Sequence, residues 1–317
     1  MEMHLTICGV YLVNTWQTMI KKKLISRFRV DPGTKVDLKK YPTDWTGTPV
    51  ARKLGKEAVK RRSLAILAKN REQLAEVQNL LYADDTYSVL IIFQALDAAG
   101  KDGTIRHVMS GVNPQGCQVF SFKHPSAEEL DHNFLWRYAN RLPERGRIGI
   151  FNRSYYEEVL VVKVHPEIVN AQKLPPRKSD RQFWAERYDD INAFERHLVR
   201  NGTIILKFFL HISKEEQKRR FLERLETPEK NWKFSAGDIA ERGHWKEYQR
   251  AFEDALTATS TKWAPWYVIP ADRKYVTRAL VSDIITSAIK KLDLRYPKVT
   301  KEKRKELEEA GKSLKDE

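Results

Sequence analysis

A loop of small residues, Ala95–Thr104 (ALDAAGKDGT), lies between an apolar run and a helix-compatible stretch. Such a turn presents several backbone N–H groups and the positive end of a helix dipole at one point, which favours phosphate. We expect Lys101 on a solvent-facing loop, reaching terminal phosphates as a point charge. The strict pattern G-x-x-x-x-G-K-S/T fails at Ala95 and Asp102, so it is a weak signal by itself. The predicted phosphate contacts are Ala98, Ala99, Gly100, Lys101, Asp102, Gly103, Thr104 and Arg106.

Asp97 lies inside this loop. A carboxylate among phosphate-binding amides repels the ligand unless a cation stands between them, so Asp97 is a predicted ligand of Mg²⁺. The alternative is that Asp97 caps the helix that follows.

A second polar pair follows another apolar run. Asn152 and Arg153 come directly after Arg147–Phe151, and an arginine at the end of a buried strand is costly without a function or a partner. We predict that both side chains reach the loop Ala95–Thr104, which we call the phosphate loop. The alternative is that Arg153 serves only as an ion-pair partner for Glu157 or Glu158.

A third group of cations lies in Lys214–Lys233. Arg219, Arg220 and Arg224 fall on consecutive turns of a predicted helix, followed by Pro228 and a polar stretch. Arginines on a mobile lid neutralise the oxygens of a phosphoryl group in transfer and exclude water. The alternative is a solvated helix whose arginines pair with Glu215, Glu216 and Glu223.

Five apolar runs are predicted to be the buried strands that position these residues: Ser88–Gln94, Cys117–Phe122, Arg147–Asn152, Thr203–Ile212 and Trp266–Ile269. Predicted helices separate them, including an amphipathic helix over 56–82, a capping box at Ser126 and Glu129, and a helical face that carries Trp184, Tyr188, Ile191, Glu195 and Leu198. Strands that alternate with helices indicate an α/β, three-layer fold with a parallel sheet. Its ligand crevice lies beyond the carboxyl ends of the strands.

Charge and composition narrow the function classes. The formal net charge is +15, from 57 Lys+Arg against 42 Asp+Glu. Residues 20–62 alone contain 14 of these cations and only four acidic residues. This basic arm indicates an anionic partner, or else a solvated face. Two cysteines favour a reducing cytoplasm, and no apolar run is long enough for a membrane span. H-E-x-x-H, G-x-S-x-G and G-x-G-x-x-G are absent, which argues against zinc proteases, serine hydrolases and dinucleotide-dependent oxidoreductases.

The chain divides into four predicted parts. Residues 1–18 contain the apolar run Leu5–Val13 without a basic start, so we expect a non-native extension ahead of a natural start at Met19. Residues 19–86 form the basic arm and a leading helix, 87–296 the catalytic core, and 297–317 a charged tail.

Five segments resemble the family 2 polyphosphate kinases: Phe93–Gly116, Phe120–Arg137, Phe151–Val161, Lys207–Arg220 and Trp266–Tyr275. The resemblance runs from about Phe28 to Tyr296. It implies a P-loop kinase fold related to thymidylate kinase, with five parallel strands and a helical lid at about 214–245. It also implies Mg²⁺-dependent phosphoryl transfer between inorganic polyphosphate and a nucleotide.

The same resemblance places the family's phosphate-loop Asp and Lys on Asp97 and Lys101, its second pair on Asn152 and Arg153, and its lid arginines approximately on Arg219, Arg220 and Arg224. Many members carry Asp where this chain has Asn152. The chain is more similar to the class III members, which carry Asn and accept both AMP and ADP. We therefore expect AMP, ADP, ATP and polyphosphate as ligands, Mg²⁺ as cofactor, and a cytoplasmic homo-oligomer.

Two other functions stay open at this point. One is an ATP-dependent nucleoside or nucleotide kinase with the same loop. The other is a nucleic-acid-binding protein, which the chain supports poorly because no recognised module is present and the basic arm lacks interleaved aromatic residues. We accordingly expect neither nucleic acid nor a membrane as partner.

Overall fold

The five predicted strands form one parallel sheet in the computed structural model, which describes residues 24–45, 47, 53, 55–176, 178–232 and 234–316. Every pair of neighbouring strands is parallel, in the order β2-β3-β1-β4-β5. The bounds are β1 Ser88–Gln94, β2 Cys117–Ser121, β3 Ile148–Asn152, β4 Thr203–His211 and β5 Trp266–Pro270. The α/β prediction is therefore confirmed, and the carboxyl ends of all five strands meet at one edge.

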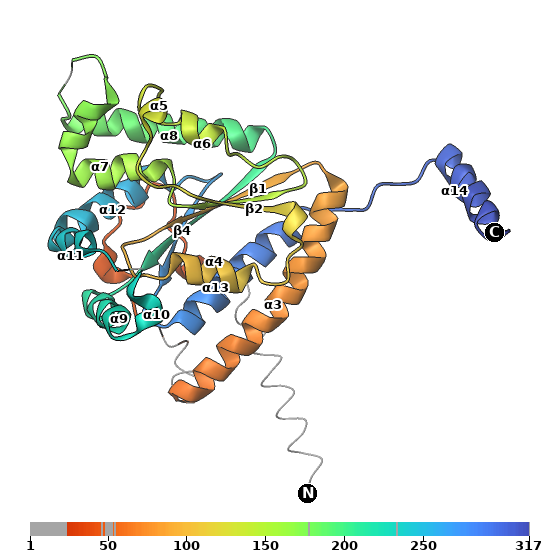
Figure 1. Cartoon of the computed structure of the whole chain (residues 1–317), viewed down its shortest axis with the longest axis horizontal. Helices are drawn as coiled ribbons and strands as arrows, with labels where there is room; N and C mark the ends of the chain where they lie inside the picture. Colours follow the sequence, from red (N-terminus) through yellow and green to blue (C-terminus); the bar gives the residue numbers. More distant parts are fainter. Residues whose placement is uncertain are drawn as a thin grey trace, which may run out of the picture.

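Helices cover both faces of the sheet (Figure 1). One face carries α3 (Lys56–Asp84), α4 (Lys101–Val108) and α13 (Lys274–Lys290), and the other carries α6 (Trp136–Ala139), α7 (Val161–Val164), α8 (Arg181–Arg200) and α12 (Trp245–Thr259). The five residues predicted to share one face of α8 are all buried, since three- and four-residue spacing places them on the side toward the sheet. None of the helices in the described ranges has both the length and the apolar character needed to cross a membrane.

The lid segment, Lys214–Gly243, follows β4 and consists of α9 (Lys214–Glu226), α10 (Pro228–Asn231) and α11 (Ala236–Gly243). Four further short elements connect the strands and helices: η3 (Pro114–Gly116), α5 (Ala127–Leu130), η4 (Tyr155–Val159) and η5 (Pro166–Gln172). The predicted capping box at Ser126 and Glu129 is present and starts α5.

The described part of the basic arm packs against the sheet. Val30 N donates to Trp266 O at 2.9 Å and Val268 N donates to Phe28 O at 2.8 Å, which attaches the chain beside β5. The arm includes the turns η1 (Ile25–Arg27) and η2 (Leu38–Lys40). Its side chains Leu24, Phe28, Val30, Val36 and Leu38 are buried, while Lys39 and Lys40 are exposed. The prediction for residues 1–18 lies outside the described residues, as do residues 19–23 at the start of the basic arm.

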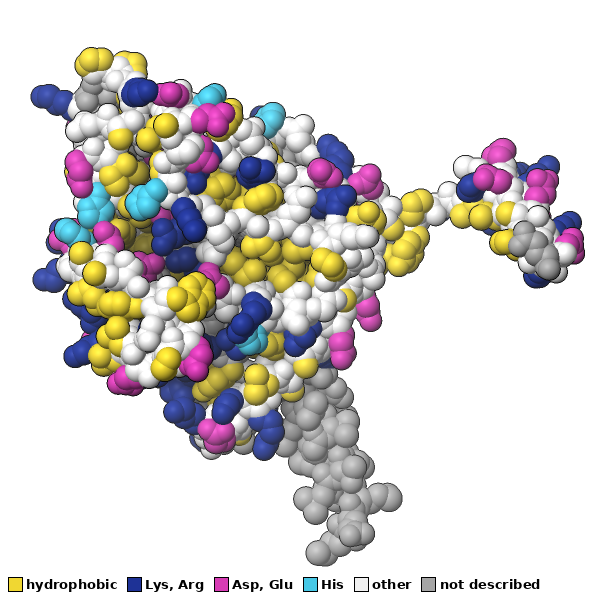
Figure 2. All heavy atoms as spheres, viewed as in Figure 1, with side chains coloured by type: hydrophobic (Ala, Val, Ile, Leu, Met, Phe, Trp, Pro, Cys, Tyr) yellow, Lys and Arg dark blue, Asp and Glu magenta, His cyan; other side chains and the backbone are white. Residues whose placement is uncertain are grey.

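The predicted charged tail contains a helix, α14 (Lys301–Ser313), that stands away from the body of the molecule (Figure 1). It has no buried residue, and Lys/Arg and Asp/Glu side chains lie next to one another on it (Figure 2). The excess of positive charge therefore lies elsewhere.

Polar side chains are buried where α3 packs on α13. Asn70 Nδ2 donates to Ser282 Oγ at 3.1 Å, and Asp283 lies beside this pair on α13. Burial raises the pKa of Asp283 from 3.8 to about 6, although Asn70 and Lys290 oppose the shift. The ionised form of Asp283 is therefore disfavoured in the folded protein.

We expect Asp283→Asn to stabilise the protein at pH 8 and not at pH 4. A raised folded-state pKa means that the contribution of Asp283 to stability is present at low pH and is lost as the pH rises through about 6. The gain at pH 8 should be roughly 2–3 kcal/mol, at 1.36 kcal/mol per pKa unit. Urea unfolding at the two pH values measures it, with Asp189→Asn on the exposed face of α8 as control. Equal effects at both pH values would contradict this account.

Candidate active site

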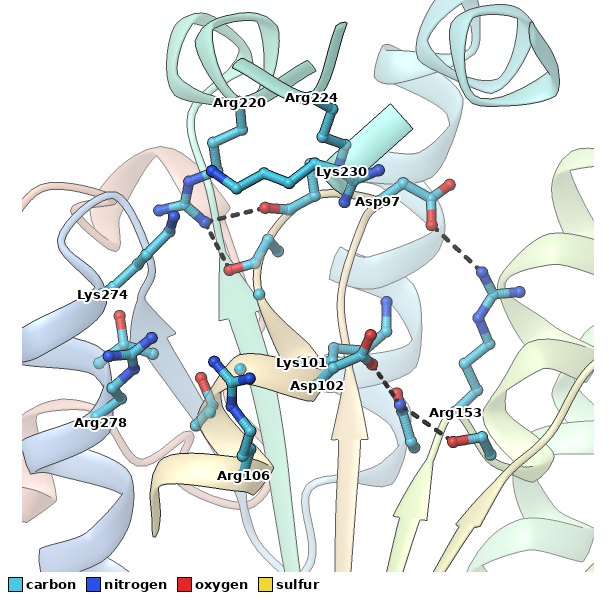
Figure 3. Close-up of a pocket in the computed structure, with 18 of the residues that line it drawn as sticks. Asp97, Lys101, Asp102, Arg106, Arg153, Arg220, Arg224, Lys230, Lys274 and Arg278 are labelled. Carbon is cyan, nitrogen blue, oxygen red and sulfur yellow. Dashed lines mark hydrogen bonds and ion pairs between the residues drawn. The ribbon is translucent and has the colours of Figure 1, made fainter. Parts of the chain in front are cut away.

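A pocket of 760 Å³ opens at the carboxyl edge of the sheet, where the crevice rule predicts it. The loop after β1, the start of α4, the ends of β2 and β3, the lid segment and the start of α13 all contribute to its walls (Figure 3). The predicted residues that line it are Asp97, Ala98, Ala99, Gly100, Lys101, Asp102, Gly103, Thr104, Arg106, Asn152, Arg153, Arg220 and Arg224.

The phosphate loop has the backbone that close approach to an anion requires. Ala98 and Gly100 have positive φ, +60° and +105°, which turns the chain sharply into α4. No side chain caps the N-terminus of α4, whose N-cap residue is Gly100. The first N–H groups of the helix are thus left for a ligand. Since Asp97 is not the N-cap residue, its alternative role as a helix cap is excluded.

Lys101 differs from its prediction in one respect. It is the first residue of α4 and partly buried, rather than on a solvent-facing loop. Its Nζ donates to the carbonyl of Ala95 at 2.8 Å, which keeps the side chain folded over the phosphate loop. Burial and the neighbouring Arg153 lower the pKa of Lys101, whereas the carboxylates around it, Asp97, Glu157 and Asp102, raise it.

Asp97 and Arg153 form an ion pair in the wall of the pocket. The Asp97 Oδ1 to Arg153 Nη2 distance is 3.2 Å, and Arg153 Nη1 lies 3.8 Å from Glu157 Oε2. Arg153 therefore both lines the pocket and makes one of the ion pairs considered as its alternative. Its φ of +65° is strained for an arginine, at a cost of about 1–3 kcal/mol. Such strain persists only where the surrounding structure holds it.

Asn152 contacts Asp102, one of the two positions that depart from the strict loop pattern. Its Nδ2 donates to Asp102 Oδ1 at 2.7 Å, whereas its Oδ1 is buried without a partner in the part of the chain that the structure describes. The amide thus accommodates a carboxylate at position 102. An aspartate at 152 would instead place two carboxylates against each other.

The residues around Asp97 fit a magnesium ion that is shared with phosphate. Within the described residues no group of three or more His, Cys, Asp or Glu side chains could hold a metal by itself. Mg²⁺ is commonly held by one or two carboxylates together with substrate phosphates. Asp97 at the pocket wall matches that donor set.

The three lid arginines are predicted to have the same role, but their surroundings in the structure differ. Arg219 does not line the pocket, is 59% exposed, and pairs with Glu216 and Glu223, as in the alternative of a solvated helix. Arg224 lines the pocket and lies 3.3 Å from Asp238 of α11. Arg220 is buried.

The guanidinium of Arg220 ties the phosphate loop to the end of β5. Its Nε pairs with Glu216 at 2.7 Å. Its terminal nitrogens donate to four backbone carbonyls, those of Ala98, Ala99, Ala271 and Asp272. Arg220 thus sets the shape of the loop besides lining the pocket.

Several pocket residues escaped the sequence-based prediction. On one side these are Ser121, Phe122, Lys123 and His124, and on the other Glu223, Lys230, Lys274, Thr277 and Arg278. The crevice rule, applied to the ends of β2 and β5 as it was to β1 and β3, would have found most of them.

The wall of the pocket formed by α4 and α13 is positively charged. In the ranges that the structure describes, Arg106, Lys274 and Arg278 make no ion pair. Burial lowers the pKa of Arg278, and repulsion from Arg106 and Arg220 lowers it further. Burial and Arg220 likewise lower the pKa of Lys274. A cluster of mutually repelling cations in a cleft attracts a polyanion.

Comparisons with known proteins point to one family. A family model described as polyphosphate kinase 2 matches residues 57–297. The chain is 52% identical over 282 residues to a Rhodopseudomonas palustris protein named ADP-polyphosphate phosphotransferase, covering 89% of this chain and 95% of that protein. It is 45% identical over 273 residues to a Meiothermus ruber protein named AMP/ADP-polyphosphate phosphotransferase, covering 86% and 96%. A crystal structure of polyphosphate kinase 2 from Arthrobacter aurescens TC1 matches with a TM-score of 0.76 at 38% identity, covering 86% of this chain and 90% of that chain.

Proposed function

The chain belongs to the polyphosphate kinase 2 family, and we propose that it transfers phosphoryl groups from inorganic polyphosphate to AMP and ADP, forming ADP and ATP. The observation that carries the proposal is the cluster of Arg106, Lys274 and Arg278 in the pocket wall beyond the phosphate loop. A nucleotide donor ends after three phosphates, whereas a polymer continues along such a cationic surface. The names of the relatives support both acceptors, ADP in one case and AMP or ADP in the other.

The pocket residues perform this transfer by positioning and charge. The acceptor is already an ionised phosphate, so no general base is required. Lys101, Arg153 and Arg224 lie where they would neutralise the oxygens of the moving group. Asp97 would hold Mg²⁺, which supplies further neutralisation of phosphate charge when bound.

Three expectations accompany this proposal and stay predictions: a homo-oligomer, a cytoplasmic location, and no role for nucleic acid.

One assay separates this function from that of an ATP-dependent kinase. The protein is incubated with Mg²⁺ and either polyphosphate with AMP or ADP, or ATP with a nucleoside, and the products are separated. We expect ADP from AMP and ATP from ADP in the polyphosphate arm, and no reaction in either arm with EDTA. Product only from ATP and the nucleoside would replace the proposal with the rival function.

Removing cations from the α13 wall of the pocket should weaken the binding of long polyphosphate donors more than that of short ones. For Lys274→Ala with Arg278→Ala we expect KM for long-chain polyphosphate to rise about tenfold, more at low salt, with a smaller change for tripolyphosphate. The control is Lys39→Ala with Lys40→Ala, which removes two exposed lysines of the basic arm that lie outside the pocket lining. A larger effect from the control pair would show that the basic arm, rather than this wall of the pocket, binds the polymer.

Asn152→Asp should change the choice between AMP and ADP. The substitution places a carboxylate against Asp102 in place of the 2.7 Å amide hydrogen bond, so negative charge accumulates beside the acceptor phosphate. At an effective dielectric near 20 one like charge at this distance is worth a few kcal/mol, and we expect a shift of at least about tenfold in the ratio of initial rates. Asn201→Asp, at the exposed end of α8, is the matched control. An unmoved ratio would leave Asn152 as a residue that only closes the strand end.

A further inference from the structure

A fully buried ionic network lies between β4, α8 and η4, outside the pocket lining, and no role described so far uses it. The hydroxyls of Tyr155 and Tyr156 both donate to Glu195 Oε1, at 3.0 and 2.9 Å. The other carboxylate oxygen of Glu195 lies 2.6 Å from Lys207 Nζ. All four side chains have 0% exposure. Burial raises the pKa of Glu195 and lowers that of Lys207, and their mutual attraction opposes both shifts.

Lys207 joins this network to the helix that follows the lid segment. Besides Glu195, its ammonium donates to Tyr156 Oη at 2.9 Å and to the carbonyl of Thr259 at 2.8 Å. Its three protons are thus all bound, and the network connects η4, α8, β4 and the last residue of α12. We call Tyr155, Tyr156, Glu195 and Lys207 the buried clamp.

The clamp begins two residues after Arg153. Between them, Ser154 is fully buried and its Oγ accepts from Gln94 Nε2 at 3.0 Å and from Tyr156 N at 3.3 Å. On the other side, Arg153 N donates to Phe93 O at 3.0 Å. The left-handed backbone of Arg153 is therefore held from the sheet at one end and from the clamp at the other.

We propose that Lys207 and Glu195 are positioning residues for Arg153. By holding the hydroxyls of Tyr155 and Tyr156, they fix the turn that keeps the Arg153 guanidinium over the pocket, 3.2 Å from Asp97. The proposal rests on the proposed function in one respect, namely that Arg153 acts on the transferring phosphoryl group. An error of about 1 Å in the place of such a group costs about 10²-fold in rate.

The alternative is that the clamp serves only stability, and it predicts something different. A buried ion pair replaced by apolar residues of similar volume commonly leaves stability unchanged or higher. Lys207→Met with Glu195→Leu should therefore fold, but the two tyrosine hydroxyls lose their partner. If the clamp is only structural, this folded variant keeps full activity.

The test compares this double variant with the native protein in polyphosphate-dependent phosphorylation of ADP. We expect kcat to fall by at least about tenfold, with KM for polyphosphate within about twofold, because the lost interaction belongs to the transition state. In an Arg153→Ala background the same double variant should change the residual rate by less than about twofold, since the clamp acts through Arg153. Asn70→Ala, which removes a buried hydrogen bond between α3 and α13, is the control and should lower the melting temperature without lowering kcat.

Each outcome decides the proposal. A folded double variant with native kcat, or one that loses the same factor with and without Arg153, overturns it. If the double variant does not fold, Tyr155→Phe removes one hydroxyl only, and it must lower kcat in the native background and not in the Arg153→Ala background. The first measurement of the series is the rate of the native protein with polyphosphate and ADP. If that rate is zero, the proposed function is refuted, and not the role of the clamp.

Discussion

We expect Lys101→Ala to lower kcat for phosphoryl transfer from polyphosphate on the order of 10²- to 10³-fold, the cost of removing one charge that stabilises a transition state. The Lys101 ammonium lies at the start of α4, beside Asp97 and Arg153, where phosphate charge must be neutralised. Within the described residues the Lys101 side chain makes one hydrogen bond, to the carbonyl of Ala95, and such a charged bond is worth about 1.5–3 kcal/mol. The fold should therefore survive, and a melting curve together with initial rates measures both effects.

The pH dependence of the activity provides a second test of the role of Lys101. Since burial and Arg153 lower the pKa of Lys101, the ammonium loses its proton at a lower pH than an ordinary lysine. Native activity should therefore fall as the pH rises through this lowered pKa, and Lys101→Ala should lack that limb. Lys69→Ala, on the exposed surface of α3, is the control. Normal turnover by Lys101→Ala would remove Lys101 from the site.

Arg220→Met should lower both stability and activity, because Arg220 connects the phosphate loop to the end of β5. The substitution leaves four backbone carbonyls without their donor and removes one of the two arginines that pair with Glu216. Breaking such a buried charged network costs about 3–5 kcal/mol. We expect the melting temperature to fall by roughly 10 °C. We also expect kcat to fall by on the order of 10²-fold, since the loop loses its shape.

Arg219→Met is the matched control, one residue away and with the same change. Arg219 is 59% exposed and pairs with acids of its own helix, so its removal should change stability by at most about 0.5 kcal/mol and kcat by at most about twofold. Comparable losses in the two variants would return Arg219 to the site and contradict the division of roles that the structure indicates.

The sequence by itself determined the sheet and the phosphate loop. Strands of a parallel sheet are buried on both faces, so each appears as a continuous apolar run, and the predicted bounds agree with β1 to β5 to within two residues at each end. The loop is equally local, because its amides, its two glycines and Lys101 are neighbours in the chain. Asn152 and Arg153 follow from the same logic, since carboxyl ends of parallel strands share one edge.

Only the tertiary structure decided which face a residue takes and what it meets. Arg219 and Arg220 are adjacent in sequence but about 100° apart around α9, and packing alone turns one to solvent and the other to the loop. The hydrogen bond from Asn152 to Asp102 joins residues 50 positions apart. The same holds for the ion pair of Lys207 and Glu195 in the buried clamp. It also holds for the cations Lys274 and Arg278, which reach the pocket from α13, because no local pattern encodes these contacts. A residue's type and spacing state what it can do, whereas its partner depends on how helices and strands far apart in the chain pack together.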